Sequence, residues 1–453
     1  MTPCNYFSGS LQSYQDIMQD FSTILDIVPK IALRCVYYLQ SQKWDRDRIA
    51  SYQDRMLRKL IRHAGRHVPY YRKLFRDIGL DPEGFRGRAD MHRIPLLDKE
   101  FLRTHTEEFI ADNVAKFGPQ WIKTSGSTGT PLRLMLSADC RANDAAATIR
   151  AYQWGGYYPG KRIFTVRGFL AQPWVFKYNM LGTSLNFDSV ELTREKAIQI
   201  LAELHKLRPQ VYHGYPFSLA MLAKIAQNEG IPIPPGNSVI TVGQTLSRHT
   251  RKLLEDAYGG KVFDFYGMTE NAVMFTECSH GNMHVIEDFA YHELVDNRGE
   301  LATEDRGELI GTSYYNYAMP LIRYRTRDNV ILRDAGETCP CGRQFRMVQD
   351  IEGRIEDFIR TPEGRLVNMA EGATGMGKGI MLSQYVQDAP DHMYVNIIPG
   401  PDFEEDSLPE VEKALRLRMG NVIGIDFKIV SQLEKADAKK TPFIISKIGN
   451  AFF

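Results

Sequence analysis

Residues 121–136 read WIKTSGSTGTPLRLML, and this stretch decides how the rest of the chain is interpreted. The run from Thr124 to Thr130 contains only threonine, serine and glycine, and apolar segments that read as strands flank it. Glycine permits positive φ and a close approach of the backbone to a ligand, and the hydroxyl and amide groups of such a turn can form an anion-binding nest. A flexible surface turn has the same composition. The run is not a Walker loop, because no Gly-Lys-Ser/Thr sequence ends it.

Outward from this stretch, short apolar runs alternate with helical stretches between about residues 121 and 350. RIFTV, SVITVG and KVFDFYG read as strands, whereas TREKAIQILAELHKL has its apolar residues at helical spacing. This alternation predicts an α/β sheet. We therefore expect a helical N-terminal region (1–115), an α/β core (116–353) and a small C-terminal domain (354–453). The predicted fold class is α/β: a large multi-sheet N-terminal domain and a small mobile α+β domain, with a hinge near residues 354–357.

The composition is that of an ordinary soluble globular protein. The 453 residues are 43% hydrophobic and 25% charged, and the formal net charge is +1, so no bulk attraction to nucleic acid or anionic lipid is implied. The most apolar early segment, FSTILDIVPKIALRCVYYLQ, is interrupted by Asp26, Pro29, Lys30 and Arg34. We expect a packed helix pair there, or a membrane-surface contact, but no transmembrane segment. No signal peptide is evident, so we expect a cytoplasmic protein without disulfides.

Two later segments carry chemistry-bearing residues at the ends of apolar strands. FDFYGMTE places Tyr266 and Glu270 where ligand sites of α/β proteins lie. A tyrosine can stack on a flat base, and a glutamate is a hard oxygen ligand suited to Mg²⁺ on a polyphosphate. MPLIRYRTRDNVIL ends its polar run at Asp328, whose carboxylate can accept hydrogen bonds from both hydroxyls of a ribose. Taken alone, a tyrosine or an arginine on a strand is more often a packing or surface group.

Together and in this order, the segments resemble the adenylate-forming ligases. The branch they resemble is that of phenylacetate–CoA ligase and the capsule-biosynthesis adenylating enzymes. The resemblance covers nearly the whole chain. The stretches that carry it are LIRHAGRHVPYYRKLF, IPLLDKEFLRTH, TSGSTGTP, HGYPFSL, VGQTL, FYGMTE, MPLIRYRTRD, CPCGR, GRIED and KKTPFIISKI.

The resemblance implies a reaction in two steps that uses ATP and Mg²⁺. A carboxylic acid is converted to an acyl-adenylate, and a thiol such as CoA, or an amine or hydroxyl acceptor, then takes the acyl group. The hydroxyl-rich loop would hold phosphates, the VGQTL loop would border the adenine, and Thr269 and Glu270 would hold the α-phosphate and Mg²⁺. The residues implied in ATP binding are Ser125, Gly126, Ser127, Thr128, Gly129, Thr130, Gly243, Gln244, Thr245, Tyr266, Gly267, Asp328 and Arg354.

The same resemblance assigns the mobile catalytic lysine to Lys440, with Lys439 as the alternative register. A surface lysine of the same sequence would only be solvated. The chain departs from the family at three places: the glycine that usually precedes the lysine is absent, Glu356 replaces the usual hinge aspartate, and Arg327 replaces a glycine. We expect Arg327 either to crowd the nucleotide or to add a phosphate contact.

Cysteine and histidine residues in two distant segments predict a metal site. ECSHGNMHV offers Cys278 with His280 or His284, and CPCGR offers Cys339 and Cys341. Three thiolates and an imidazole suit a closed, structural Zn²⁺ site; the alternative is a set of inert buried thiols. The resemblance favours His284 over His280.

The acyl pocket is assigned to QVYHGYPFSLAML, through Tyr212, His213 and Tyr215, together with Phe217. His213 could orient the carboxylate of the acid, or it could be a satisfied core histidine. The predicted function is therefore ATP-dependent carboxylate activation, with CoA and amine or hydroxyl acceptors left equal. A non-catalytic nucleotide-binding or scaffold protein is the alternative. The sequence leaves the oligomeric state open, a homodimer included.

Overall fold

The fold is described from a computed structural model. It describes residues 27–123, 132–167, 176–179, 181–188, 194–354, 358–363, 366–368, 379–400, 402–434 and 444–448. Three predictions fall outside these residues: the phosphate loop (Ser125 to Thr130), the hinge glutamate (Glu356) and the catalytic lysine (Lys440, or Lys439).

A twelve-stranded sheet forms the centre of the large domain, in the order β11-β12-β13-β14-β10-β9-β8-β7-β6-β3-β5-β4. Its parallel part contains β3 (Ile163–Arg167), β5 (Ser184–Asp188), β6 (Val211–Gly214), β7 (Ser238–Val242) and β8 (Lys261–Gly267). The short strand β4 (Phe176–Tyr178) closes one edge of the sheet in antiparallel pairing with β5.

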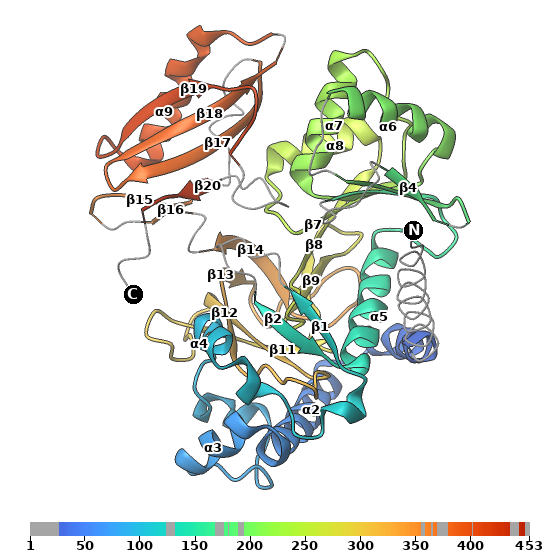
Figure 1. Ribbon diagram of the computed structural model, residues 1–453, viewed down its shortest axis with the longest axis vertical. Coiled ribbons are helices and arrows are strands. Elements are labelled where there is room, and N and C mark those ends of the chain that lie inside the picture. The colour runs from blue at the N-terminus through green and yellow to red at the C-terminus, as the bar shows by residue number, and fades with distance from the viewer. Residues whose placement is uncertain are drawn as a thin grey trace, which may run out of the picture.

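Helices cover both faces of this parallel part, as the alternation in the sequence predicts (Figure 1). On one face, the buried apolar side chains of α6 (Arg194–Leu207), α7 (Pro216–Asn228) and α8 (Arg248–Tyr258) form one core with the strands. On the other face, Tyr152 of α5 (Ala138–Trp154) packs against Ile163, Val211, Ile240 and Val242. The side chains of β6 and β7 are buried throughout, which is typical of a parallel sheet covered on both sides.

The rest of the large sheet is antiparallel and belongs to the second half of the domain. It contains β9 (Met274–Glu277), β10 (Met283–Val285), β11 (Ala290–Val295), β12 (Arg306–Ser313), β13 (Tyr324–Leu332) and β14 (Met347–Arg354). A separate hairpin of β1 (Gln120–Lys123) and β2 (Arg133–Leu136) flanks the hydroxyl-rich stretch. Leu132 and Leu134 at this hairpin are fully buried in the same core as Tyr324.

The described part of the N-terminal region, which starts at residue 27, is mainly helical. Within the described part of the early apolar segment, residues 27–41 form a single helix. In α2 (Arg46–His67) the side chain of Asp45 caps the helix by accepting from the Arg48 N–H, and its apolar face is buried. Pro69 starts α3 (Pro69–Asp77) as its first residue, because proline lacks the N–H that a first turn does not need. Short helices follow: η1 (Arg88–Arg93), α4 (Lys99–Thr104), η2 (Thr106–Phe109) and η3 (Val114–Phe117).

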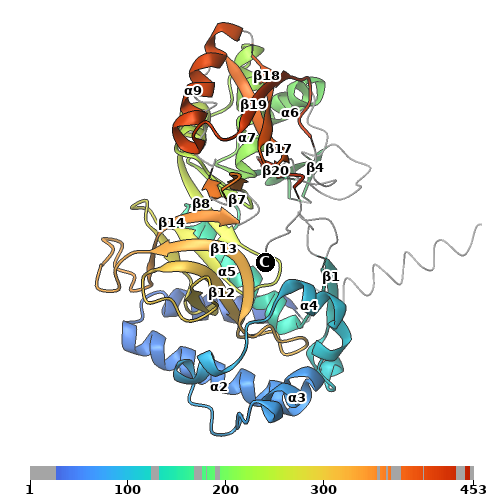
Figure 2. The ribbon, with the colours of Figure 1, turned by 90° about the vertical axis from the view of Figure 1, so that its left-hand side faces the viewer.

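The C-terminal domain is a four-stranded sheet in the order β19-β18-β17-β20, with one helix packed on it (Figure 2). Its elements are β17 (Ile380–Ala389), β18 (His392–Pro399), η7 (Glu405–Ser407), α9 (Leu408–Met419), β19 (Gly424–Ile429) and β20 (Ile444–Ser446). A small hairpin of β15 (Phe358–Arg360) and β16 (Leu366–Asn368) precedes them. The fold class predicted from the sequence, a large α/β domain followed by a small α+β domain, is confirmed. Among the residues that the structure describes, none of the helices has both the length and the apolar character needed to cross a bilayer.

Candidate functional site

Two of the three predicted nucleotide-binding segments meet where the end of β8 lies beside the middle of β13. The hydroxyl of Tyr266 donates to Oδ2 of Asp328 at 2.5 Å, although 62 residues separate them in the chain. The Asp328 carboxylate is almost fully buried, and its backbone N–H donates to the hydroxyl of Thr326 at 3.1 Å. A phenol and a carboxylate are thereby fixed side by side, which gives a rigid polar edge suited to a ligand with hydroxyl groups.

The ring of Tyr266 is held in place by Phe275 on β9. The two rings are stacked with centroids 4.9 Å apart and planes 25° from parallel. Because Phe275 covers one face of the tyrosine ring, a flat base can stack only on the other face.

Glu270 lies in the turn between β8 and β9 and is also buried. Its Oε1 accepts a hydrogen bond from the hydroxyl of Tyr324 at 3.2 Å, whereas the neighbouring Thr269 is exposed. Tyr324 was missed from the sequence, although the signal is present: β13 alternates buried and half-buried residues, so Tyr324, Thr326 and Asp328 share one face. The same face of β13 therefore serves both carboxylates of the candidate site.

The loop predicted to border the adenine follows β7 and reaches the start of α7. Gly243 has a φ of +70°, a conformation that favours glycine. The side-chain oxygen of Gln244 accepts from the backbone N–H of Phe217 at 3.3 Å. Since β6 and β7 are parallel neighbours, their carboxyl ends lie together, and this hydrogen bond ties the two loops that follow them.

Arg327 has a defined partner outside the predicted nucleotide-binding segments. Its backbone is left-handed, with a φ of +64°, a conformation that favours glycine. Its guanidinium donates to the carboxylate of Asp98, the cap of α4, at 2.7 Å. Arg327 therefore ties β13 to the N-terminal helical region through Asp98. Arg354 faces Asp328 across the β13–β14 ladder as its backbone partner.

Tyr212 is not available to an acyl pocket. Its side chain is fully buried in the core shared with α6, α7 and α8, where its hydroxyl donates to the carbonyl of Pro234 at 2.5 Å. Its ring centroid lies 4.5 Å from that of Tyr258 on α8. Adjacent residues of a strand point to opposite faces, so Tyr212 points away from His213, and we remove it from the candidate pocket.

His213 faces α5 and has partners on both ring nitrogens. Its Nε2 lies 2.7 Å from the hydroxyl of Tyr152, and its Nδ1 lies 3.3 Å from the hydroxyl of Thr165. This arrangement is that of a satisfied core histidine at the base of the region between α5 and the sheet. Tyr215, which follows β6, is half-buried and packs with Tyr152 and Phe265 in this region. Tyr152 was not predicted, and no signal in its surroundings in the sequence marks it.

The predicted metal ligands converge at the antiparallel part of the sheet. The ligand atoms of Cys278, His284, Cys339 and Cys341 all lie within 4.8 Å of one another. The Sγ atoms of Cys278 and Cys339 are 3.7 Å apart, and Sγ of Cys341 is 3.4 Å from Nε2 of His284. Zinc–sulfur bonds of about 2.3 Å at tetrahedral angles place two sulfurs roughly 3.8 Å apart, so the donor set fits Zn²⁺.

Groups around this cluster support the same interpretation. Nδ1 of His284 lies 3.3 Å from the carbonyl of Phe345, which fixes the tautomer that leaves Nε2 for a metal. Burial lowers the pKa of His284 to about 4, so the ring is neutral, as a ligand must be. The amide of Asn282 donates to Sγ of Cys339 at 3.2 Å. His280, the alternative ligand, is exposed and lies outside the cluster.

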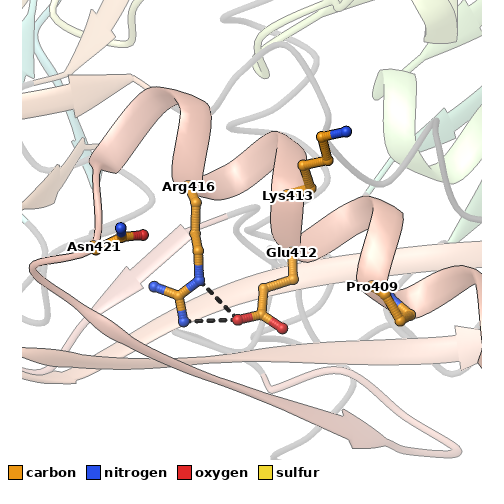
Figure 3. A pocket seen from close by; sticks show the side chains of 5 residues that line it. All are labelled: Pro409, Glu412, Lys413, Arg416 and Asn421. Carbon is orange, nitrogen blue, oxygen red and sulfur yellow. Dashed lines mark hydrogen bonds and ion pairs between the residues drawn. The ribbon is translucent and has the colours of Figure 1, made fainter.

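A shallow hollow on the outer face of α9 lies apart from both sites (Figure 3). Pro409, Glu412, Lys413, Arg416 and Asn421 line it. Arg416 and Glu412 form an ion pair of 2.7 Å one helical turn apart, which is the usual arrangement of a solvated helix face. We assign no function to this hollow.

Comparisons of the sequence with known proteins find one matching domain family and several relatives. Residues 359–447 match the family described as the CapK C-terminal domain. A phenylacetate–coenzyme A ligase of Thermus thermophilus is 26% identical over 332 residues, which cover 72% of this chain and 74% of the relative. Protein CapK of Staphylococcus aureus is 22% identical over 376 residues, which cover 80% and 81% of the two chains.

A solved structure shares the fold over nearly the whole chain. It is a 2-hydroxyisobutyryl-CoA ligase in the postadenylation state, with a TM-score of 0.73, 19% identity and coverage of 90% of this chain and 91% of that one. The sequence relatives, together with the shared fold, identify the chain as an adenylate-forming ligase. Among these ligases, the chain is similar in sequence to the phenylacetate–CoA ligases and to CapK.

Proposed function

We propose that this protein activates a carboxylic acid with ATP and then passes the acyl group to CoA or to an amine or hydroxyl acceptor. In the first step a carboxylate oxygen attacks the α-phosphorus, and the bond to the leaving pyrophosphate breaks. In the second step the acceptor attacks the acyl carbonyl, and AMP leaves. The observation that carries the proposal is the contact between Tyr266 and Asp328, which joins two separate motifs into one edge for a nucleoside.

Each residue of the proposed site has a distinct chemical role. Tyr266 offers one ring face to the adenine, and Asp328 accepts hydrogen bonds from the ribose hydroxyls. Glu270, a buried carboxylate beside Tyr324, would hold Mg²⁺, which neutralises charge on the phosphates. The Ser125–Thr130 loop would cradle the β- and γ-phosphates, and Lys440 would offset charge on the α-phosphate in the transition state.

One of the two acceptor classes is supported by a relative. The Thermus relative is named a phenylacetate–coenzyme A ligase, which supports CoA. Residues 359–447 match the CapK C-terminal domain, and the name of CapK specifies no acceptor, so the amine or hydroxyl acceptor is for the experiment below to test. The half-buried Tyr215 and Tyr152, with Phe265, give the region beside α5 an aromatic character, which supports an aromatic or apolar acid.

The Cys/His cluster is proposed to hold a structural zinc ion. Four protein ligands close a tetrahedral site, so no position remains for water or substrate. In this role Cys278, His284, Cys339 and Cys341 stabilise the β9–β10 region and the segment before β14, and they take no part in catalysis.

The decisive experiment is acid-dependent release of pyrophosphate from ATP, measured over a panel of acids that begins with phenylacetate. Each acid that releases pyrophosphate is then incubated with CoA and separately with small amines and alcohols, and the products are identified by mass spectrometry. The Glu270→Gln variant, purified in the same way, controls for contaminating ligases. If no acid releases pyrophosphate while ATP still binds, the non-catalytic nucleotide-binding alternative replaces the proposal.

A further inference from the structure

Asp144 on α5 is a carboxylate without a partner. Its side chain is half-buried, and it takes part in no hydrogen bond or ion pair among the residues that the structure describes. Burial raises the pKa of this carboxyl to about 6, with no contribution from a neighbouring cation. Aspartates that serve the fold are paired or hydrogen-bonded, because a shielded charge without compensation costs stability. The folded chain therefore gives Asp144 no structural role.

Contacts at the other end of α5 show how far along the helix Asp144 lies. A methyl group added at Gly155, the C-cap of α5, would be 3.4 Å from the ring of Phe263, and the ring centroids of Tyr152 and Phe265 are 5.9 Å apart. The helix thus runs antiparallel to β8, beside β8 and β9 (Figure 1). Asp144 precedes Gly155 by about 16 Å of helix, which is about five residues of strand. Asp144 is therefore level with the turn that follows β8.

The helical repeat gives the direction in which Asp144 points. Around the axis of α5, Asp144 lies about 80° from Tyr152 and about 60° from Ala147, between the two. Tyr152 faces Phe265 of β8, and Ala147 is fully buried in the core that contains Met274 of β9. A side chain between these directions, level with the end of β8, faces the turn between β8 and β9.

This turn has an unpaired acceptor of its own. Asn271 is only 5% exposed, and its backbone is left-handed, with a φ of +56°. Its amide donates to the carbonyl of Thr269 at 3.2 Å, but its side-chain oxygen is buried and accepts no hydrogen bond from the described part of the chain. The helix and the turn that it faces thus each hold an acceptor for which these residues supply no donor, and such groups are rare unless a ligand completes them.

The chemistry of the two acceptors favours an ammonium group as that ligand. Hard metal cations take roughly six to eight oxygen ligands, and within the described residues Asp144 belongs to no group of three metal-binding side chains. An ammonium group has only three N–H donors and compensates the charge of a carboxylate. Thr269 is predicted to hold the α-phosphate, which the carboxylate of the acid attacks. A donor that reaches Asp144 at the same turn is therefore close to that carboxylate, on the neighbouring carbon atom.

We propose that the acid activated by this protein is an α-amino acid, and that Asp144 binds its ammonium group. This inference rests on the proposed function, because it names the substrate class of the same site. The side chain of the amino acid would extend along α5 toward Tyr152, Tyr215 and Phe265, whose rings favour an apolar or aromatic group. An acid without the amino group would leave the Asp144 carboxylate shielded from water and unpaired, and would bind more weakly.

Three acids that differ in one substituent test the substrate class. Phenylalanine, phenyllactate and 3-phenylpropanoate carry an ammonium group, a hydroxyl and a hydrogen on the α-carbon. We expect kcat/KM for pyrophosphate release to be roughly 100-fold higher with phenylalanine than with 3-phenylpropanoate, and intermediate with phenyllactate. The corresponding series for leucine and alanine repeat the comparison with smaller side chains. The Glu270→Gln protein controls for contaminating aminoacyl-tRNA synthetases.

The Asp144→Asn variant tests whether this residue makes the distinction. The preference for the amino acid should shrink to within about threefold, mainly through a higher KM for the amino acid. Asp139→Asn is the matched control: Asp139 is also on α5, about 140° further around the helix, and its variant should keep the full preference. Because the folded pKa of Asp144 lies above the ordinary value for aspartate, its ionised form costs stability at neutral pH. Asp144→Asn should therefore raise the melting temperature by roughly 2–4 °C.

The outcomes separate this inference from the proposed function. The inference is wrong if the unsubstituted acids release pyrophosphate as well as the amino acids do. It is also wrong if Asp144→Asn keeps the preference or lowers the melting temperature, as loss of a structural carboxylate would. Release with unsubstituted acids would leave the proposed function intact. If no acid releases pyrophosphate, the proposed function is wrong. Calorimetric binding of phenylalanine and 3-phenylpropanoate to wild type and Asp144→Asn then decides the role of Asp144, and binding without a preference for phenylalanine overturns it.

Discussion

The Cys/His cluster lies in the antiparallel part of the sheet, whereas the Tyr266–Asp328 edge joins β8 of the parallel part to β13 of the antiparallel part, and the two sites are built in opposite ways. The four ligand atoms of the cluster lie within 4.8 Å of one another, so the group is complete by itself. At the edge, the Tyr266 hydroxyl donates to Asp328 and Phe275 stacks on one face of the Tyr266 ring. The four residues of the cluster come together as one compact donor set, whereas the edge is a pair of side chains that we propose binds a nucleoside.

This difference separates stability from activity. A closed tetrahedral site contributes folding free energy and offers no place for substrate. In the proposed function, the polar groups of the Tyr266–Asp328 edge are arranged for a ligand, so changes there are expected to lower activity more than stability. Changes at the cluster should therefore lower the melting temperature with little effect on the activity of the folded enzyme. Changes at the edge should lower the activity with little effect on the melting temperature.

The largest effect is expected at Glu270. Glu270→Gln removes the charge proposed to hold Mg²⁺ but keeps the shape and the contact with Tyr324, so the rate of pyrophosphate release should fall roughly 100-fold. The melting temperature should stay within a few degrees. Glu300→Gln on the surface is the control, and a Glu270→Gln enzyme with full activity would exclude the assignment of Mg²⁺ to this carboxylate.

Cys278→Ser should produce the largest loss of stability. Loss of one ligand opens the site, so metal analysis should show less than one zinc per chain and the melting temperature should fall by roughly 5–10 °C. The KM for ATP of the folded fraction should not change. Cys35→Ser, which alters a half-buried cysteine outside the cluster, is the matched control. If wild-type protein contains no zinc after purification in metal-replete medium, the cluster is not a zinc site.

A smaller effect is expected at the nucleoside edge. Asp328→Asn weakens the hydrogen bonds offered to a ribose, so the KM for ATP should rise roughly tenfold with a smaller change in kcat. Tyr266→Phe keeps the ring that stacks on Phe275 and removes only the hydroxyl, and we expect a rise of roughly two- to fourfold. The double variant should be less than additive, because the two side chains act through one contact. Full additivity would indicate that they act independently.

The smallest effect is expected at Arg327. Glycine relieves the left-handed backbone by about 1–2 kcal/mol. It adds an entropic cost of about 0.5–1 kcal/mol and removes an ion pair with Asp98 worth at most about 1 kcal/mol at a half-exposed position. The free energy of unfolding of Arg327→Gly, measured in urea, should therefore stay within about 1 kcal/mol of wild type, and the KM for ATP should be unchanged. Asp98→Asn isolates the ion-pair part. A large change in the KM for ATP would indicate that Arg327 contacts a phosphate of the nucleotide.

The sequence predicted the features that motifs encode and missed those that depend on which way a side chain faces. FYGMTE and RYRTRD were enough to expect Tyr266 and Asp328 together, and the two cysteine-containing segments were enough to expect the cluster. Tyr212 was misplaced because VYHG is buried on both faces, so no alternation of polar and apolar residues marks the side of the pocket. The direction of Arg327 depends on a positive φ that its residue type does not announce. Leu433 and Phe217 meet across two domains, and no periodicity within either segment reports such a contact.

The register of β13 and β14 has a mechanical consequence. Asp328 lies directly opposite Arg354, the last described residue before the chain passes to the small domain. Neighbouring strands are about 4.8 Å apart, so a sugar held by Asp328, as we propose, would rest one strand away from the point where the chain leaves for the small domain. We therefore expect a spin label on β14 to report the binding of a nucleotide to the neighbouring strand.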